Sequence, residues 1–185
     1  MFEPLADTMI VGLGHKARHG KDTVASLLAK DLSALYGPGS VQRHSFADDL
    51  YAVARVQYGM TKKDGKLLQI LGTEIFRRMD PDVWVRSLYW KLAEKCPRVC
   101  IIADVRFPNE AAFIKQMGGH LVKVTRKNKD GSLWVTTDRD PNHPSEVSLD
   151  GYDGWDYEIV AEDGNIAALV SGAAKLAGIV AGVRV

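Results

Sequence analysis

Residues 9–25 constrain the fold of this 185-residue chain more than any other segment. A short apolar run, residues 9–13, leads into a basic loop bracketed by Gly14 and Gly20, and a helical pattern begins at Lys21. Glycines let a backbone approach an anion closely, and the unpaired N–H groups at a helix start point toward it. A strand, a loop and a helix in this order predict a phosphate-binding loop, with the ammonium of Lys21 beside the phosphates of a nucleoside triphosphate.

The loop departs from the strict phosphate-loop pattern, which has four residues between its glycines and Ser or Thr after the lysine. Here five residues separate the two glycines, and an aspartate follows the lysine. Either His15 takes the place of the first glycine or the loop is one residue longer. Asp22 or Thr23 must then replace the hydroxyl that usually binds Mg²⁺. The residues expected around the triphosphate are Gly14, His15, Lys16, Ala17, Arg18, His19, Gly20, Lys21, Asp22 and Thr23.

The charge and cysteine content narrow the class of protein. A formal net charge of +1 gives no basic field for gripping long nucleic acid, so a small charged substrate fits better. The two cysteines, Cys96 and Cys100, are too few for a zinc ribbon or a disulfide framework. We expect both in the core of a protein in a reducing compartment, the cytoplasm.

No segment reads as a signal peptide or a membrane span. The first residues lack the basic start of a signal peptide, and the apolar tail from Ile166 is interrupted by Ser171, Gly172 and Lys175. We therefore expect no membrane association and interpret the tail as a packed helix.

Strand and helix patterns alternate along the chain, which predicts an α/β fold of three layers with a central parallel sheet. Residues 99–103 form a continuous apolar run, as in a strand buried on both faces. In the helix predicted over residues 66–78, Leu67, Leu68, Leu71 and Ile75 have the spacing of an inward face. Strands are expected at residues 9–13, 41–46, 99–103, 121–125 and 157–161, and helices at 21–36, 50–58, 66–78, 82–95, 109–117 and after Asn165.

Several short motifs are distributed along most of the chain, and their order is informative. The most specific are Gly-Lys-Asp-Thr at residues 20–23 and Asp-Val-Arg-Phe-Pro-Asn-Glu at 104–110. Weaker ones lie at residues 45–48, 71–74 with Arg77, 80–84, 118–119, 124–126 and 143–146. In this order the motifs resemble the phage deoxynucleoside monophosphate kinases, a branch of the P-loop nucleotide kinases.

The resemblance implies transfer of the γ-phosphoryl group of ATP, with Mg²⁺, to a deoxynucleoside 5′-monophosphate. It implies one nucleotide kinase domain over residues 1–185, with a helical acceptor-binding region at 47–97 and a lid at 126–151 that excludes water. The lid segment is polar without a sustained period, so a plain solvated loop is the alternative. The family also suggests a possible homodimer, located in the host cytoplasm if the chain is phage-encoded.

Catalysis of this kind rests on positioning and on cations that balance the charge of the phosphoryl oxygens. The resemblance assigns Lys21, Arg106 and Arg126 as catalytic, with Gly164 on the wall opposite Arg126 around ATP. It assigns the acceptor nucleotide to Asp48, Arg77, Trp84, Asp104, Arg106 and Glu110, and lid contacts to Arg139, His143 and Glu146.

Most of these residues also have a purely structural reading. Asp48 after a strand is also a common helix cap, with Asp49 competing for the role, and Asp104 and Arg106 can form an internal ion pair. An acid in the first turn of a helix, such as Glu110, is favoured by the helix dipole. The remaining alternatives are a surface arginine for Arg126, a core aromatic for Trp84, and turn and cap residues for His143 and Glu146.

Three other function classes stay open. A P-loop kinase for another small phosphorylated acceptor, such as phosphomevalonate or dephospho-coenzyme A, has a similar donor half. A nucleotide-binding switch or motor subunit would hydrolyse the triphosphate with water. A nonenzymatic domain with a decayed loop would show no turnover.

Overall fold

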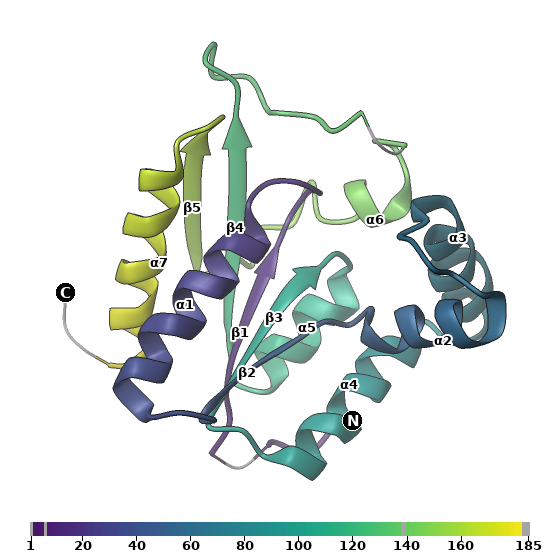
Figure 1. Ribbon diagram of the computed structural model, residues 1–185, viewed down its shortest axis with the longest axis horizontal. Helices are drawn as coiled ribbons and strands as arrows, with labels where there is room; N and C mark the ends of the chain where they lie inside the picture. Colours follow the sequence, from purple (N-terminus) through teal and green to yellow (C-terminus); the bar gives the residue numbers. More distant parts are fainter. Residues whose placement is uncertain (1, 6, 138–139, 183–185) are drawn as a thin grey trace.

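The structure is a computed structural model that describes residues 2–5, 7–137 and 140–182. Its centre is a five-stranded sheet in the order β2-β3-β1-β4-β5 with every neighbouring pair parallel (Figure 1). The predicted α/β class and parallel sheet are confirmed. The strands are β1 (Met9–Gly14), β2 (Val41–His44), β3 (Val99–Val105), β4 (His120–Lys127) and β5 (Tyr157–Glu162).

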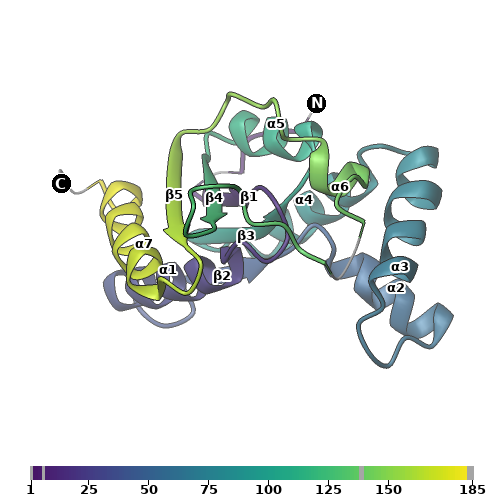
Figure 2. The ribbon, with the colours of Figure 1, turned by 90° about the horizontal axis from the view of Figure 1, so that it is seen from above.

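Helices cover both faces of the sheet and make the three predicted layers (Figure 2). One face is covered by α1 (Lys21–Tyr36) and α7 (Ile166–Val180), and the other by α4 (Val83–Lys95) and α5 (Pro108–Gln116). The remaining helices are α2 (Asp48–Tyr58), α3 (Gly65–Gln69), the π-helix η1 (Ile70–Arg77) and the short α6 (Pro144–Val147).

The central strands are buried on both faces because side chains alternate along a strand. In β1, Val11 and Leu13 pack with α1 and α7, whereas Ile10 packs with the opposite core. Ile101 and Ile102 of β3 divide in the same way. This double burial explains the continuous apolar run that predicted the strand.

Helices α2, α3 and η1 form a lobe beside the sheet, which we call the helical lobe (Figure 1). The predicted helix over residues 66–78 exists as α3 continued by η1, and Leu68 and Leu71 are buried as expected. The prediction for Ile75 is wrong, because this side chain is exposed. A π-helix has more residues per turn than an α-helix, so the inward face of an α-helical count rotates away from the core within η1.

Two local predictions need correction. The strand predicted over residues 41–46 ends at His44, because the next residues turn toward β3. Cys100 is buried in β3 as predicted, but Cys96 is exposed, since it ends α4 with a left-handed backbone at φ 41°. Within the described part of the chain, no helix is long and apolar enough to cross a membrane.

Residues 128–156 connect β4 to β5 and carry α6; we call them the β4–β5 segment. Figure 1 shows this segment running from the end of β4 across the top of the sheet toward the helical lobe. Most of its length is irregular, as the polar composition predicted. It therefore lies at the carboxyl ends of the strands, where ligands bind in open α/β sheets.

Candidate active site

The loop between β1 and α1 has the conformation of an anion-binding turn. Gly20 has a left-handed backbone at φ 94°, and so have His15 at 91° and Arg18 at 61°. Lys21 opens α1 with its side chain folded back into the loop, where Nζ donates to the carbonyls of Lys16 (2.5 Å) and His15 (3.3 Å). Burial lowers the pKa of Lys21 well below its usual value, so a negative partner would stabilise its charged form.

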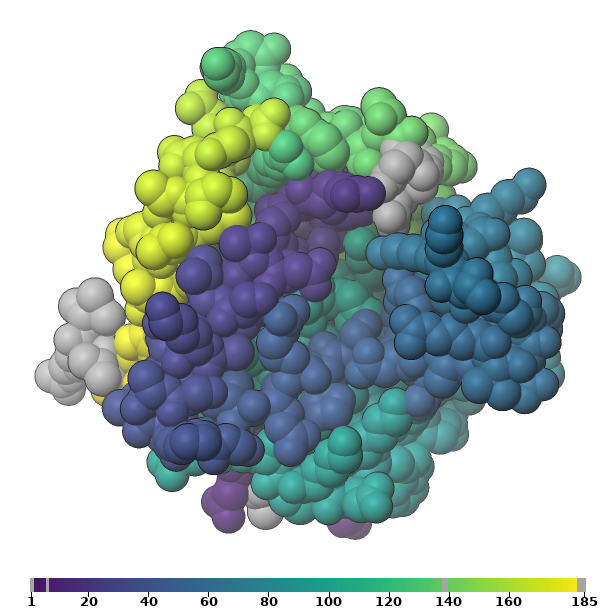
Figure 3. Space-filling model, in the orientation of Figure 1, coloured from purple at the N-terminus to yellow at the C-terminus, as the bar shows by residue number. Residues whose placement is uncertain are grey.

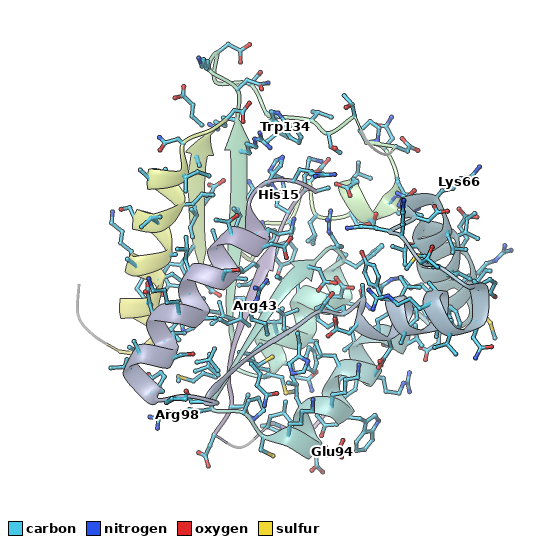
Figure 4. All side chains as sticks on the ribbon, in the orientation of Figure 1. His15, Arg43, Lys66, Glu94, Arg98 and Trp134 are labelled. Carbon is cyan, nitrogen blue, oxygen red and sulfur yellow. The ribbon has the colours of Figure 1, made fainter. Side chains whose placement is uncertain are left out.

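The two histidines of the loop are buried, and burial lowers the pKa of both. Burial, together with the neighbouring His19 and lysines, lowers the pKa of His15 to about 4. The His19 ring accepts from the backbone N–H of Arg126 at Nδ1, and Nε2 pairs with the Trp134 carbonyl. Figure 4 shows His15 of the loop below Trp134 of the β4–β5 segment. The loop is thus attached to β4 and the β4–β5 segment.

Glu146 of α6 reaches the phosphate loop. Its Oε2 accepts from the backbone N–H of Ala17 at 2.8 Å, and its Oε1 accepts from Arg106 Nη1 at 2.8 Å. Lys16 Nζ donates to the backbone carbonyl of Glu146 and to Asp150 in the same segment. The loop therefore already holds one carboxylate on a backbone amide, which is the interaction that a phosphate oxygen would make there.

Glu110 organises two arginines at the end of β3. Its Oε1 pairs with Arg77 Nη2, and its Oε2 accepts from the backbone N–H groups of Arg106 (2.6 Å) and Phe107 (3.0 Å). The Arg77 guanidinium also stacks on the Phe107 ring at 4.1 Å. Burial raises the pKa of Glu110 to about 7, although Arg77 opposes the shift. Glu110 is therefore a positioning residue that holds the Arg77 guanidinium of η1 near the backbone of Arg106, the residue that follows β3.

Asp104 holds the segment that follows β2. Its carboxylate accepts from the Ser45 hydroxyl and from the backbone N–H groups of Phe46 (2.8 Å) and Ala47 (3.0 Å). Asp48 accepts from the Ser45 N–H at 3.0 Å and lines the cavity described below, whereas Asp49 pairs with Ser87 and Lys91. Burial raises the pKa of Asp104. No Asp104–Arg106 ion pair is present among the described residues.

A cavity of about 840 Å³ opens at the carboxyl ends of the strands, and Figure 3 shows the surface hollowed between α1 and the helical lobe. It extends without interruption from the phosphate loop to the helical lobe. Of the predicted residues, it is lined by Ala17, Arg18, Gly20, Lys21, Asp22, Thr23, Asp48, Arg77, Trp84, Asp104, Arg106 and Glu110. The structure therefore brings all six predicted acceptor residues and six of the ten predicted loop residues to one cavity. The other four loop residues do not line it: Gly14, His15, Lys16 and His19.

Trp84 is both a core residue and part of the cavity wall. It is buried, packs against Phe76, and donates from Nε1 to the Gly72 carbonyl at 3.1 Å. This bond ties α4 to η1. A Cβ on Gly72 would lie 2.6 Å from Leu50 Cδ2, so the close approach of η1 to α2 depends on glycine.

Arg126 lies outside the cavity lining, at the edge of the phosphate loop. Its guanidinium stacks on the Trp134 ring at 4.1 Å, pairs with Asp163, and donates to the Arg18 carbonyl at 3.1 Å. Gly164 follows Asp163 in an open turn at φ 82°, where a Cβ would have no neighbour within 4 Å. The two predicted walls around ATP are therefore adjacent.

The oxygen donors at the start of α1 fit Mg²⁺. Asp22 and Thr23 are exposed and line the cavity. Among the described residues there is no group of three or more His, Cys, Asp or Glu side chains that could hold a metal. Magnesium typically keeps several waters and binds one or two carboxylates plus substrate phosphates, so a site with few protein oxygens suits it.

The remaining lid residues differ in what they contact. His143 caps α6, since its Nδ1 accepts from the Ser145 N–H at 3.2 Å. This agrees with the alternative that His143 is a turn residue before Pro144. Arg139 lies outside the described residues.

Gly14, the first predicted loop residue, ends β1 against Trp155, and a Cβ on Gly14 would lie 2.5 Å from the indole ring.

Sequence reasoning missed several cavity residues. Ser45 belongs to a quoted motif, and its position after β2 was the signal available. Thr73 likewise belongs to the motif at residues 71–74, but Tyr51 and Gln69 carry no comparable signal, because helical residues of these types are common on ordinary surfaces. They line the cavity together with Arg43 and Lys63.

The chain resembles solved kinases in fold. Thymidylate kinase from Ehrlichia chaffeensis is 13% identical with a TM-score of 0.52, covering 91% of this chain and 98% of that one. Shikimate kinase from Bacteroides thetaiotaomicron is 17% identical with a TM-score of 0.55, covering 94% and 98%. At these identities the likeness shows the fold alone, and it confirms the predicted P-loop kinase fold.

Two curated relatives are more similar in sequence. The putative deoxynucleotide monophosphate kinase of Acanthamoeba polyphaga mimivirus is 34% identical over 115 residues, and the match spans 56% of this chain and about half, 54%, of that relative. The deoxynucleoside-5′-monophosphate kinase of Escherichia phage T5 is 24% identical over 77% of this chain and 85% of its own length. The family model for deoxynucleotide monophosphate kinase matches residues 54–172. This chain belongs to the deoxynucleotide monophosphate kinase family.

Proposed function

We propose that this protein transfers the γ-phosphoryl group of ATP to a deoxynucleoside 5′-monophosphate, giving ADP and the deoxynucleoside diphosphate. The observation that carries the proposal is the single cavity between the Lys21 loop and the Arg77–Glu110–Arg106 group. A hydrolase needs only the loop and a water, whereas a second cationic group across the cavity suits a phosphorylated acceptor.

The donor triphosphate would occupy the phosphate loop. Lys21 Nζ, now bound to loop carbonyls, would turn to the β- and γ-phosphates, and the loop N–H groups would donate to their oxygens. Asp22 and Thr23 would hold Mg²⁺ beside the phosphates, where the ion neutralises charge that develops on the oxygens. Arg126 on the Trp134 ring would border the remainder of ATP together with Gly164, which follows the Arg126 partner Asp163.

The acceptor would place its phosphate between Arg77 and Arg106. Both guanidiniums are held, Arg77 by Glu110 and Phe107, and Arg106 by Glu146. A phosphate oxygen is already a competent nucleophile, so the protein must only align it with the γ-phosphorus and balance charge. Held arginines lose little entropy at that step.

The β4–β5 segment would act as the lid over the transferring group. Glu146 and Lys16 join it to the phosphate loop, and Glu146 joins it to Arg106. A segment that contacts both sides can exclude water, which would otherwise convert transfer into hydrolysis.

The test is incubation of the protein with ATP, Mg²⁺ and each of the four deoxynucleoside monophosphates, with nucleotide products separated by chromatography. Diphosphate from at least one acceptor is the expected result. ADP and inorganic phosphate without a phosphorylated acceptor would indicate a hydrolase or switch. Transfer only to a different phosphorylated acceptor would overturn the choice of substrate.

We further expect a cytoplasmic protein, consistent with two free cysteines. A homodimer stays a prediction. Some large apolar side chains on the helical lobe, on α4 and between them are exposed: Val56, Tyr58, Met79 and Trp90. Sedimentation of the purified protein would show whether it forms a dimer that could cover them.

A further inference from the structure

Gln69, the last residue of α3, lines the cavity. Its side-chain amide nitrogen, Nε2, is enclosed and has no hydrogen-bond partner among the described residues, so the amide must turn toward the cavity to meet a ligand. Buried amide donors are almost always paired in native proteins, so an unpaired one beside a cavity points to a partner that arrives with a ligand.

The cavity wall that includes Gln69 is largely apolar and aromatic, with the Lys63 ammonium 5.9 Å from the centroid of the Tyr51 ring. Tyr51, Leu68 and Trp84 supply aromatic and aliphatic wall, and Thr73 lies one helical turn beyond Gln69. Apolar and aromatic walls with a few placed polar groups are typical of small-molecule pockets. An aromatic wall with one amide suits a flat heterocycle that has hydrogen-bonding atoms on its edge.

The cavity is polarised. Arg77 and Arg106 are joined through Glu110 near the end of β3, whereas Tyr51, Gln69 and Trp84 come from α2, α3 and α4. A nucleoside monophosphate has the same polarity, with an anionic phosphate at one end and a base at the other. Resting on the function proposed above, this match places the base toward Gln69.

We propose that Gln69 is a specificity-determining residue, whose amide hydrogen-bonds the edge of the acceptor base. A carboxamide carries a donor and an acceptor side by side in one plane, and this pair complements neighbouring groups on a base edge, as in the bidentate pairing of glutamine with adenine. The base group most directly addressed is the exocyclic substituent at position 4 of a pyrimidine or position 6 of a purine.

The test is a double-mutant-type cycle, in which one change is made in residue 69 and the other in the acceptor base. Wild type, Gln69→Ala and Gln69→Glu are assayed with the best natural deoxynucleoside monophosphate and with its analogue that lacks the exocyclic 4- or 6-substituent. For the natural acceptor, Gln69→Ala is expected to lower kcat/KM by about tenfold or more, mostly through KM, since one base-edge pair is worth that factor. For the analogue the same variant should change kcat/KM less than about twofold, because the partner group is already missing.

Gln57→Ala is the matched control, because Gln57 is exposed on the neighbouring α2 and is not among the cavity-lining residues. It should leave kcat/KM unchanged for both acceptors. Gln69→Glu keeps the size of the side chain and loses the donor, so it carries the test if the alanine variant does not fold. Thermal unfolding of each variant establishes that it does.

Equal losses for the natural acceptor and the analogue, or no loss for either, would overturn the role of Gln69. If wild type phosphorylates no deoxynucleoside monophosphate, the proposed function fails on its own. Calorimetric binding of the same two nucleotides to wild type and Gln69→Ala then decides the inference separately: a loss confined to the natural nucleotide supports it, and any other pattern rejects it.

Discussion

The carboxylate of Glu146 lies between Arg106 and the phosphate loop, accepting from Arg106 Nη1 and from the Ala17 N–H at 2.8 Å each. One side chain therefore joins α6, the end of β3 and the loop after β1. The pair is buried, with the Glu146 side chain 3% exposed and that of Arg106 18% exposed. A buried ion pair is costly to break from one side, because the remaining charge is left without its partner.

We expect Glu146→Gln to destabilise the protein by about 1–3 kcal/mol, since a neutral amide offers one acceptor oxygen where the carboxylate offered two. Urea unfolding followed by fluorescence measures the change. Asp150→Asn is the control, because Asp150 is half-exposed and its pair with Lys16 should contribute less than about 1 kcal/mol. Equal effects of the two variants would contradict a special role for Glu146.

Replacement of Lys21 by methionine should lower kcat by at least about 100-fold while stability stays the same or rises. The ammonium is needed where charge develops on the phosphoryl oxygens, and a loss of this size is typical for one such group. Burial already disfavours the charged form of Lys21 in the nucleotide-free protein, so the methionine variant avoids the desolvation cost of that charge. Steady-state kinetics and thermal unfolding give the two readouts.

Lys30→Met provides the comparison for Lys21, because Lys30 is an exposed lysine on the same helix. It should leave kcat and the melting temperature close to wild type. Wild-type turnover in Lys21→Met would contradict the proposed contact between Lys21 and the phosphates of ATP.

Arg126→Met should raise the KM for ATP by roughly 5- to 30-fold with a smaller effect on kcat, because the guanidinium borders the donor side and not the transferring group. The stacked Trp134 offers a second readout. Addition of ATP should change indole fluorescence in wild type, and the change should shrink in the variant. Arg86→Met, which removes an exposed pair with Asp80, should alter neither signal.

The raised pKa of Glu110 predicts a pH dependence of stability. In the unfolded chain this carboxyl titrates near 4.5, and in the folded protein near 7, so between these values the folded state holds the extra proton. Stability contributed by this group is therefore greatest below pH 4.5 and falls as pH rises to about 7, by up to about 1.4 kcal/mol per pH unit.

Glu110→Gln isolates that dependence, because it lacks the titrating group and keeps the shape. The difference in unfolding free energy between wild type and Glu110→Gln should move against wild type from pH 4.5 to 7 and then level off. A difference that stays flat across this range, measured by urea unfolding at fixed salt, would exclude the raised pKa.

The sequence allows the sheet and the phosphate loop to be predicted because both are local patterns. The apolar run at residues 99–103 can only be a doubly buried strand or a buried helix segment, and its length decides for the strand. Gly20 and Lys21 follow β1 at the spacing of a helix start. These signals need no knowledge of what packs against them.

The site contacts could not be predicted in the same way, because they join distant residues. Asp104 caps the segment at Ser45, and Glu110 binds Arg77, yet no periodicity relates these positions. The sequence also gives no sign of the π-helix that exposes Ile75, because hydrophobic spacing is counted with the residues per turn of an α-helix. Gln69 became visible only through its unpaired buried nitrogen.

The position of β1 in the middle of the sheet has a consequence for how the chain acquires its shape. Met9 pairs with Val99 of β3, and Val11 pairs with His120 of β4, so β1 has no sheet partner until β3 has been synthesised, and its second partner follows with β4. Parallel pairing across such sequence distances is slow, because long loops must close first. During synthesis the apolar residues of β1 would stay without a strand partner until β3 has left the ribosome, which makes assembly of the sheet beneath the loop at residues 14–20 a late event in folding.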